Sequence, residues 1–312
     1  MQLRTLRTCD FDELADVFPR WNLRLRQIGR GPFRGQLQLL QHEGTQVFQL
    51  AVNRMTHIEG WLDPPGSFGC FPVLAANEKA IWHGRRLKVG QVRVFDPSQD
   101  ADHMTAPVNY KLVGLALDGD LYRKEAPVLG GIDLEERRVG REVITTNLAY
   151  CRALRSHLVG LIDLARARPD LVAQSGRLIE QECLRRFTGL LARPHEDRTA
   201  RQPSNRARLV RRAEEYLRAN LRHPLSMFDL CRELAISERT LHYAFQEVRG
   251  LSPMAYFQTS RLNAVRQELK AAQPGKATVH EIARRWGFWH TGEFAAAYRR
   301  LFGELPSQSL NR

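Results

Sequence analysis

The C-terminal stretch 278–306 constrains the fold most, because it has the pattern of two short helices joined by a tight turn. One face of the first helix is predicted to carry Val279, Ile282 and Ala283, and Gly287 can end this helix. His290 or Thr291 can cap the second helix, whose apolar face is predicted at Phe294, Tyr298, Leu301 and Phe302. This arrangement is typical of a helix-turn-helix, whose second helix can lie in the major groove of DNA.

The same order of small and bulky residues recurs 53 positions earlier in the chain. At this offset Phe294 falls on Leu241, Gly303 on Gly250, and the cap His290 on Ser237. Recurrence at a fixed offset indicates one supersecondary unit used twice, so we predict helix-turn-helix units at 226–250 and 278–303. The spacer helix predicted over 252–272 would be ~31 Å long, close to the ~34 Å of one turn of DNA.

Positive charge is concentrated in the part of the chain that contains these two units. The formal net charge is +13, and from Ser204 onward 18 Lys and Arg stand against 10 Asp and Glu. An excess of cations on a helical domain is expected where the domain binds a phosphate backbone. A generally basic protein is the plainer explanation for the charge of the remaining residues.

The N-terminal half has a different pattern, with short strands and frequent turns. Strands are predicted at 35–40, 46–53, 57–62, 68–74, 87–95 and 110–117, separated by turn sequences rich in Gly, Pro and Asp. The expected fold class is therefore α+β. An N-terminal antiparallel β-barrel or jelly roll, of cupin-like form, is followed by helices and then by an all-α domain with two helix-turn-helix units joined by the spacer helix.

Apolar stripes after the strands predict two helices, one from Ile144 to Ala165 and one from Leu178 to Leu191. These helices could cover the barrel or pair with a second subunit, and the sequence leaves both arrangements open. Residues 193–204 carry two prolines and mixed charges, which is typical of a solvated linker. The predicted domains are 1–192, for effector binding and dimerisation, and 205–312, for DNA binding.

A small barrel can hold a ligand, and aromatic side chains are dense in this one. The candidate effector pocket consists of Trp61, Phe68, Phe71, Trp82 and Phe95. Such rings could bind an ammonium compound through cation–π attraction, although an ordinary apolar core is the simpler explanation for each ring.

No catalytic or metal site is predicted. His42, His57, His83 and His103 are isolated, with no HxH pair and no carboxylate at ligand spacing. Nucleophile and phosphate-loop signatures are absent from the sequence, so no cofactor is expected. The five cysteines form no CxxC pair, and no apolar run is long enough to span a bilayer, so a cytoplasmic protein without membrane contact is expected.

Residues 206–310, and above all IARRWGFWHTGEFAAAYRRLFGELP, resemble the DNA-binding domain of the AraC/XylS family of bacterial transcriptional regulators. The segments RLNAVRQEL and GFWHTGEFAAAYRRLFGELPSQSL are more similar to the subgroup around the ethanolamine-utilisation regulator. Ser309 departs from the family pattern, which often has an aromatic residue after the final proline.

The resemblance implies base contacts from the outer face of each second helix. These candidates are Glu238, Arg239, His242, Tyr243 and Gln246 in the first unit and Thr291, Glu293 and Ala295 in the second. Candidate phosphate contacts are Ser237, Arg284, Arg285, His290, Arg299 and Arg300. Because the second set is short or acidic, we expect the first unit to supply most sequence discrimination.

The expected function is sequence-specific transcriptional regulation, as a ligand-responsive activator. The expected partners are double-stranded promoter DNA, RNA polymerase, a small-molecule effector for which an amine is one candidate, and a second copy of the chain in a homodimer. The alternatives are a DNA-docked enzyme, which would need a reactive cysteine cluster, and an architectural DNA binder without a ligand.

Overall fold

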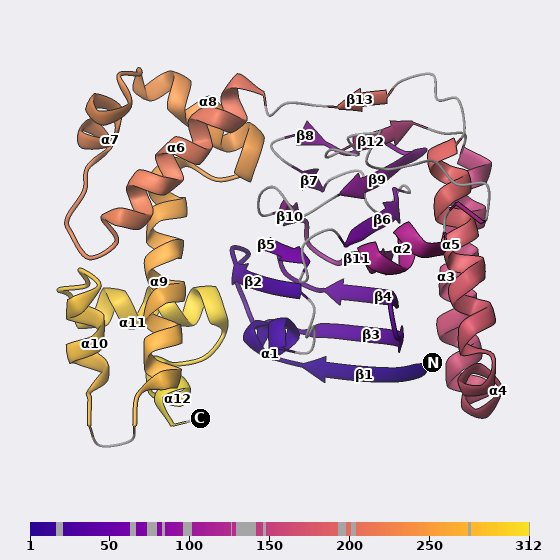
Figure 1. The fold of residues 1–312 in the computed structure, drawn as a ribbon. Coiled ribbons are helices and arrows are strands. Elements are labelled where there is room, and N and C mark those ends of the chain that lie inside the picture. Colours follow the sequence, from indigo (N-terminus) through magenta and orange to yellow (C-terminus); the bar gives the residue numbers. More distant parts are fainter. Residues whose placement is uncertain are drawn as a thin grey trace.

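The computed structural model describes residues 1–16, 21–62, 67–73, 80–82, 85–95, 102–125, 127–128, 142–145, 148–192, 198–200, 204–273 and 276–311. The β-sheets occupy the middle of the molecule. Helices α3–α5 lie on one side of the sheets and the C-terminal helices α6–α12 lie on the other side (Figure 1).

The N-terminal part is built from two antiparallel sheets. The strand order of the larger sheet is β1 (Gln2–Thr8), β3 (Gly35–His42), β4 (Thr45–Val52), β11 (Tyr110–Leu117), β6 (Phe68–Pro72), β9 (Gln91–Phe95), β12 (Glu142–Thr145) and β13 (Arg198–Ala200). The order of the smaller sheet is β2 (Trp21–Gln27), β5 (Thr56–Leu62), β10 (Asp102–Ala106), β7 (Ile81–Trp82) and β8 (Arg85–Arg86). All six predicted strands are present. The prediction missed β1, β2, β10, β12 and the short strands β7, β8 and β13.

The prediction of an antiparallel sheet domain is confirmed, but a closed barrel is wrong for the described strands. The two sheets stay separate, and no described strand of one pairs with a strand of the other. They are held together by apolar side chains that alternate along the strands and meet between the sheets, among them Leu37, Leu50, Ile58 and Met104. Apolar side-chain packing therefore holds the two sheets together, whereas in a closed barrel backbone hydrogen bonds would connect them.

Five helices are described in the N-terminal part. They are α1 (Phe11–Asp16), which follows β1, and α2 (Gly119–Glu125), α3 (Leu148–Ala167) and α5 (Gly176–Ala192), with the short α4 (Pro169–Gln174) between the last two. The outer face of the sheet, with Leu40, Val47 and Leu115, packs against Leu158 and Phe187 of α3 and α5. The apolar stripe thus covers the sheet, one of the two arrangements that the sequence left open. Ile144 lies in β12, so the helix begins one turn later than predicted.

The C-terminal part is all-helical, as predicted. Its helices are α6 (Asn205–Ala219), α7 (Met227–Leu234), α8 (Glu238–Arg249), α9 (Pro253–Ala271), α10 (Val279–Arg285), α11 (Thr291–Phe302) and α12 (Pro306–Leu310). Within the segment predicted as a linker, Arg198–Ala200 form β13 and pair with β12. The boundary between the two domains stays a prediction.

The two helix-turn-helix units differ in how their cores are built. The first has a core of its own, which includes Val210, Leu241 and Phe245. The second shares one continuous core with the sheets through α1, because the ring of Phe302 stacks on that of Phe11 with centroids 6.2 Å apart. Ser309 is buried beside this core, and its Oγ lies 2.6 Å from the hydroxyl of Tyr298.

Polar contacts fix the second unit against the sheets at three positions. The side-chain amide of Gln27 donates to the carbonyl of Leu301 at 2.6 Å, and the backbone N–H of Gly31 donates to the carbonyl of Arg300 at 3.0 Å. The side chain of Asn263 on α9 donates to the carbonyl of Gln27 at 3.0 Å.

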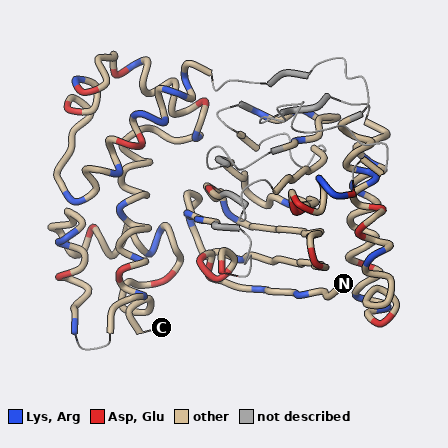
Figure 2. Tube along the Cα trace, in the orientation of Figure 1, with Lys and Arg blue, Asp and Glu red and all other residues tan. Residues whose placement is uncertain are grey.

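An interdomain ion-pair cluster completes this interface, and consists of Asp10, Asp12, Arg266, Lys270 and Glu304. The Arg266 guanidinium lies 3.0 Å from Asp10, 2.9 Å from Asp12 and 3.2 Å from Glu304, and Lys270 Nζ lies 2.6 Å from Asp10. The acidic positions of α1 lie on the side of the sheets that faces α9 (Figure 2). Burial raises the pKa of Asp10, but hydrogen bonds from Arg266 and Lys270 outweigh it and lower that pKa to about 2.

We predict that the substitution Asp10→Asn lowers the free energy of unfolding at neutral pH. The folded-state pKa of Asp10 lies below its ordinary value of 3.8, so the stabilisation is complete above pH ~4 and is lost as the pH falls toward 2. The difference between parent and variant should therefore shrink over this range. Urea unfolding followed by circular dichroism at a series of pH values measures it, and a difference that stays constant from pH 6 to pH 2 would contradict the prediction.

Candidate DNA-binding surface

The first helix-turn-helix is fixed by side-chain caps at both helix starts. The Ser226 hydroxyl accepts from the backbone N–H of Asp229, and the Asp229 carboxylate accepts from the backbone N–H of Ser226 at 3.1 Å. The Ser226 hydroxyl also donates to the Asp229 carboxylate at 2.6 Å, and this bond, together with the one from the Ser226 N–H, lowers the pKa of Asp229. Ala235 ends α7 in the left-handed region, with a φ of 51°, and Ser237 caps α8 by accepting from Thr240 N–H at 3.3 Å. The turn thus directs α8 outward.

All five base-contact candidates of the first unit lie exposed on α8, and their exposure follows from the helical period. Leu241, Ala244 and Phe245 turn inward, which leaves Glu238, Arg239, His242, Tyr243 and Gln246 in solvent. The Tyr243 side chain is 56% exposed, and the Arg239 guanidinium lies 5.6 Å from its ring centroid. The structure therefore brings Arg239 and Tyr243 together on one open face.

The second unit repeats this design with a longer turn. Thr278 and Glu281 form the same reciprocal cap at the start of α10. The first-helix caps Ser226 and Thr278 are 52 positions apart, whereas the second-helix caps are 53 apart, so the stretch between the two caps is one residue longer in the second unit. Since α10 is also one residue shorter than α7, the turn spans 286–290 in the second unit and 235–237 in the first. His290 occupies the cap position of α11 as predicted, but its side chain makes no capping hydrogen bond.

The base-contact candidates of α11 are close to solvent but have short or acidic side chains. Thr291 and Glu293 are exposed and Ala295 is half-buried. The hydroxyl of Thr291 lies 3.2 Å from Nδ1 of His280 on α10, a contact that the sequence analysis missed.

Trp289 is a further exposed residue that the sequence analysis did not select. It lies in the turn before α11, its side chain is 60% exposed, and the Arg284 guanidinium lies 5.2 Å from its ring centroid. The sequence could have indicated this residue, because a tryptophan that lies outside the apolar faces of both predicted helices is expected to be exposed. Indole is an amphipathic group that can contact sugar and phosphate as well as a base.

The phosphate candidates divide into two groups. Arg284, Arg299 and Arg300 have exposed side chains, and basic positions recur along α10 and α11 (Figure 2). Arg285 is engaged by Glu268 of α9 at 2.6 Å, and the Ser237 hydroxyl is used in capping α8. The first group is therefore the better placed to meet an approaching phosphate.

The structure does not gather the predicted aromatic effector pocket into one space. Phe68 packs on the outer side of the larger sheet, against Tyr122 and Phe187, with ring centroids 5.6 and 6.3 Å away. Phe71 and Trp82 lie between the sheets, where the buried Arg93 guanidinium is 4.2 and 4.0 Å from their ring centroids. The side chains of Trp61 and Phe95 lie outside the described residues, as do those of His83 and His103.

The fold brings together three side chains that could bind a metal ion, a grouping that residue spacing does not indicate. Atoms of His42, Glu43 and Glu180 lie within 4.8 Å of one another, and His42 Nδ1 is 3.4 Å from the buried Glu180 carboxylate. The His42–Glu43 pair belongs to the β3–β4 hairpin and Glu180 to α5, so only the fold brings them together.

Comparison with known proteins supports the assignment of the helical part. Residues 230–312 match the family model described as a helix-turn-helix domain. The chain is 38% identical over 132 residues to the probable thc operon regulatory protein of Rhodococcus erythropolis, across 41% of this chain and 39% of that protein. It is 35% identical over 101 residues to the XylDLEGF operon transcriptional activator 1 of Pseudomonas putida, across 32% and 30%. The match thus spans well under half of each relative.

A probable AraC family transcriptional regulator from Rhodopseudomonas palustris is 40% identical across 34% of this chain and 96% of that chain, with a TM-score of 0.31. None of the helices in the described part of the chain is long and apolar enough to cross a membrane. The match to the helix-turn-helix model and the similarity to the two regulatory proteins show that the chain carries the DNA-binding domain of a transcriptional regulator.

The two turns predict opposite effects of exchanging alanine and glycine. Gly287 has a φ of 78°, and a Cβ added there would lie 3.3 Å from the Arg261 guanidinium, so we predict that Gly287→Ala lowers the free energy of unfolding by ~1 kcal/mol. Ala235 already bears the left-handed strain, so Ala235→Gly should be neutral or stabilising by up to ~1 kcal/mol. Urea unfolding of both variants measures this, and equal destabilisation by both would refute the strain argument.

Proposed function

We propose that this chain, whose C-terminal part is a helix-turn-helix DNA-binding domain of the AraC/XylS type, is a one-component transcriptional activator that responds to a small molecule. In this proposal the N-terminal sheet domain binds the effector. The C-terminal domain binds promoter DNA and brings RNA polymerase to it. Pairing of two copies through the N-terminal domain would present both DNA-binding domains to one promoter, and the resemblance to the ethanolamine-utilisation regulators stays part of the proposal.

The observation that carries the proposal is the placement of two exposed second helices on one rigid spacer. Helix α9 has 19 residues, which corresponds to ~28 Å at 1.5 Å per residue. It joins α8 of the first unit to α10 and α11 of the second (Figure 1). Successive major grooves on one face of DNA are ~34 Å apart, so one chain can present both helices to adjacent grooves.

Side-chain chemistry supports a division of roles between the two helices. Arg239 can bind the O6 and N7 atoms of guanine together, and His242 and Tyr243 can hydrogen-bond to base edges. On α11, Ala295 can contact a thymine methyl and Glu293 can accept from a cytosine amino group, but both reach a short distance. We propose that α8 supplies most of the discrimination and that α11 positions the domain, with Arg284, Arg299 and Arg300 on phosphates.

The three buried thiols do not suit a DNA-docked repair enzyme. Such an enzyme needs a cysteine that readily forms a thiolate. Burial raises the pKa of Cys70 and Cys151, and it raises that of Cys183 to about 12. These three thiols are therefore unsuited to nucleophilic chemistry.

A pair of variants tests the division of roles. We predict that Arg239→Ala lowers the preference for the selected site over scrambled DNA by ~1–3 kcal/mol, roughly 5- to 150-fold, because a base contact is lost. Arg284→Ala should weaken binding to both DNAs alike and lower the salt slope of log K by about 1. Fluorescence anisotropy with a site selected from random oligonucleotides measures both effects.

The two variants serve as controls for each other, since each removes one exposed guanidinium that lies near an aromatic ring. If Arg239→Ala kept the parent's ratio of specific to scrambled binding, α8 would not be the principal reader. Failure of the parent to prefer any sequence in the selection would contradict the proposed function itself.

A further inference from the structure

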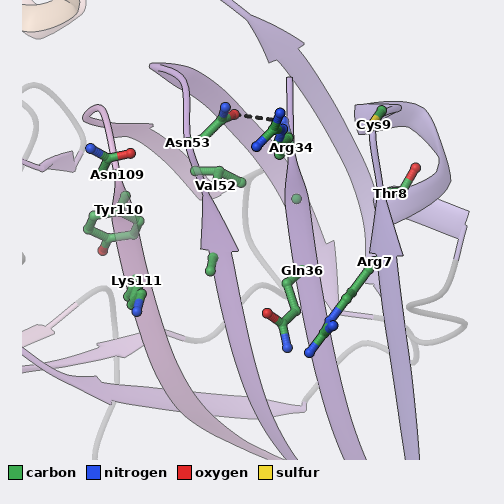
Figure 3. Close-up of a pocket in the computed structure, with 12 residues that line it drawn as sticks. Arg7, Thr8, Cys9, Arg34, Gln36, Val52, Asn53, Asn109, Tyr110 and Lys111 are labelled. Atoms are coloured by element: carbon green, nitrogen blue, oxygen red, sulfur yellow. Dashed lines mark hydrogen bonds between the residues drawn. The ribbon is translucent and has the colours of Figure 1, made fainter. Parts of the chain in front are cut away.

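A pocket of about 660 Å³ lies at one end of four neighbouring strands, β1, β3, β4 and β11 (Figure 3). It is lined by Arg7, Thr8, Cys9, Arg34, Gly35, Gln36, Ala51, Val52, Asn53, Asn109, Tyr110 and Lys111. None of the predicted effector residues belongs to it.

Strand register defines which face of the sheet holds this pocket. Arg7 pairs with Gln36, Gln36 with Ala51, and Ala51 with Lys111, so the four form one row across the strands. Side chains alternate along a strand, and this row therefore shares its face with Leu40, Val47 and Leu115. That is the outer face, which α3 and α5 cover further along the strands.

The lining has the charge of an anion site. Three cations, Arg7, Arg34 and Lys111, contribute to it, and no Asp or Glu does. Within the described part of the chain, Arg7 and Arg34 have no carboxylate at ion-pair distance, and both side chains are exposed. Ala51 adds apolar surface on this face, so the volume and lining suit a carbon skeleton that carries a negative group, whereas the cations would repel an amine.

Hydrogen bonds connect one wall of the pocket to the interdomain ion-pair cluster. The hydroxyl of Thr8 accepts from the backbone N–H of Asp10 at 2.8 Å, and the Asp10 carboxylate binds Arg266 and Lys270 of α9. A movement of Thr8 and Cys9 would therefore move Asp10, whose carboxylate holds Arg266 and Lys270 of α9.

A second wall is connected to α11. The Asn53 side chain accepts from the backbone N–H of Arg34 at 2.7 Å and donates to the carbonyl of Pro32 at 3.1 Å. Pro32 contacts the end of α11 so closely that a Cβ on Gly303 would lie 2.8 Å from its nitrogen. The backbone N–H of the preceding residue, Gly31, donates to the carbonyl of Arg300.

We propose that this pocket binds a small organic acid, whose negative charge is attracted by the lining cations Arg7 and Arg34, and that the bound acid changes how firmly α9 and α11 are held against the sheets. This inference rests on the proposed function, because it assigns the effector class and its site. Binding on this face alters the positions of Thr8 and Asn53. Through Thr8 it reaches the interdomain ion-pair cluster, and through Asn53 and Pro32 it reaches the contact of Gly31 with Arg300.

Cys9 supplies a local reporter for binding, because it lines the pocket and is the one exposed thiol among the five cysteines. The full-length protein is alkylated with iodoacetamide, and the rate at Cys9 is followed by peptide mass spectrometry. The probes are the sodium salts of citrate, adipate and phenylacetate at constant ionic strength, with neutral phenylacetamide as the uncharged counterpart. We expect at least one acid to slow alkylation in a saturable manner and phenylacetamide to have no effect.

The matched variants are Arg7→Gln and Arg34→Gln, with Arg4→Gln as control. Arg4 is an exposed arginine on β1, an odd number of residues from Arg7 and hence on the opposite face of the strand. Loss of one charge-assisted hydrogen bond should weaken binding of the acid by at least about tenfold in the first two variants and leave it unchanged in the control. Protection of Cys9 by no acid, or equal binding by all three variants, would overturn the inference.

Coupling is tested by measuring the affinity for the selected DNA with and without the acid. Because coupling is reciprocal, an acid that changes DNA affinity must itself bind with a correspondingly changed affinity when DNA is present. Binding of the acid without any change in DNA affinity would overturn the coupling. Specific DNA binding by a parent protein that binds no acid would remove this inference and leave the DNA-binding function standing.

Discussion

The position of the second helix-turn-helix unit depends on one buried guanidinium. The side chain of Arg266 is 3% exposed, lies against three carboxylates and has the Phe11 ring centroid 4.6 Å from its Cζ atom. Removal of one partner of a buried ion pair costs ~3–5 kcal/mol, because the remaining charge is left without compensation. The cluster thus gives the interface between α9 and α1 a defined geometry that apolar packing alone would specify less strictly.

The first unit is attached to the sheets in a different way. Its core is separate, and its attachment includes an ion pair between Glu59 of β5 and Arg218 of α6 at 3.1 Å, with Arg26 at 3.4 Å from the same carboxylate. Within the unit, Glu214 binds Arg249 through two hydrogen bonds of 2.6 and 2.9 Å, which fixes α8 on α6. The two units therefore combine similar helices with unequal attachment: the second shares an apolar core with the sheets beside the interdomain ion-pair cluster, whereas the first has a separate core and is joined through charged side chains.

Local sequence pattern predicted the helical part well, because α6 to α10 each begin at a Ser or Thr cap and the buried residues recur at helical spacing. It predicted the sheets less completely. β1 was missed since its side chains are exposed or half-buried along an edge, so alternation is weak, and closure of the barrel could not be judged because local pattern does not say which edges pair. The candidate DNA-contacting residues followed from helical period, whereas the pocket at Arg7 and Arg34 depends on strand register, which residue spacing does not contain.

Residue spacing could not predict the interdomain ion-pair cluster either, because its partners lie at opposite ends of the sequence. This long-range pairing also affects how the chain folds. Asp10 and Arg266 are 256 residues apart in the sequence, so their contact closes a loop that contains most of the chain. Closing such a loop costs conformational entropy before any contact repays it, and contacts of this range slow folding. The first helix-turn-helix unit, with local contacts and a separate core, can reach its native structure early, while the core of the second unit is completed only when the N-terminal sheets are already in place.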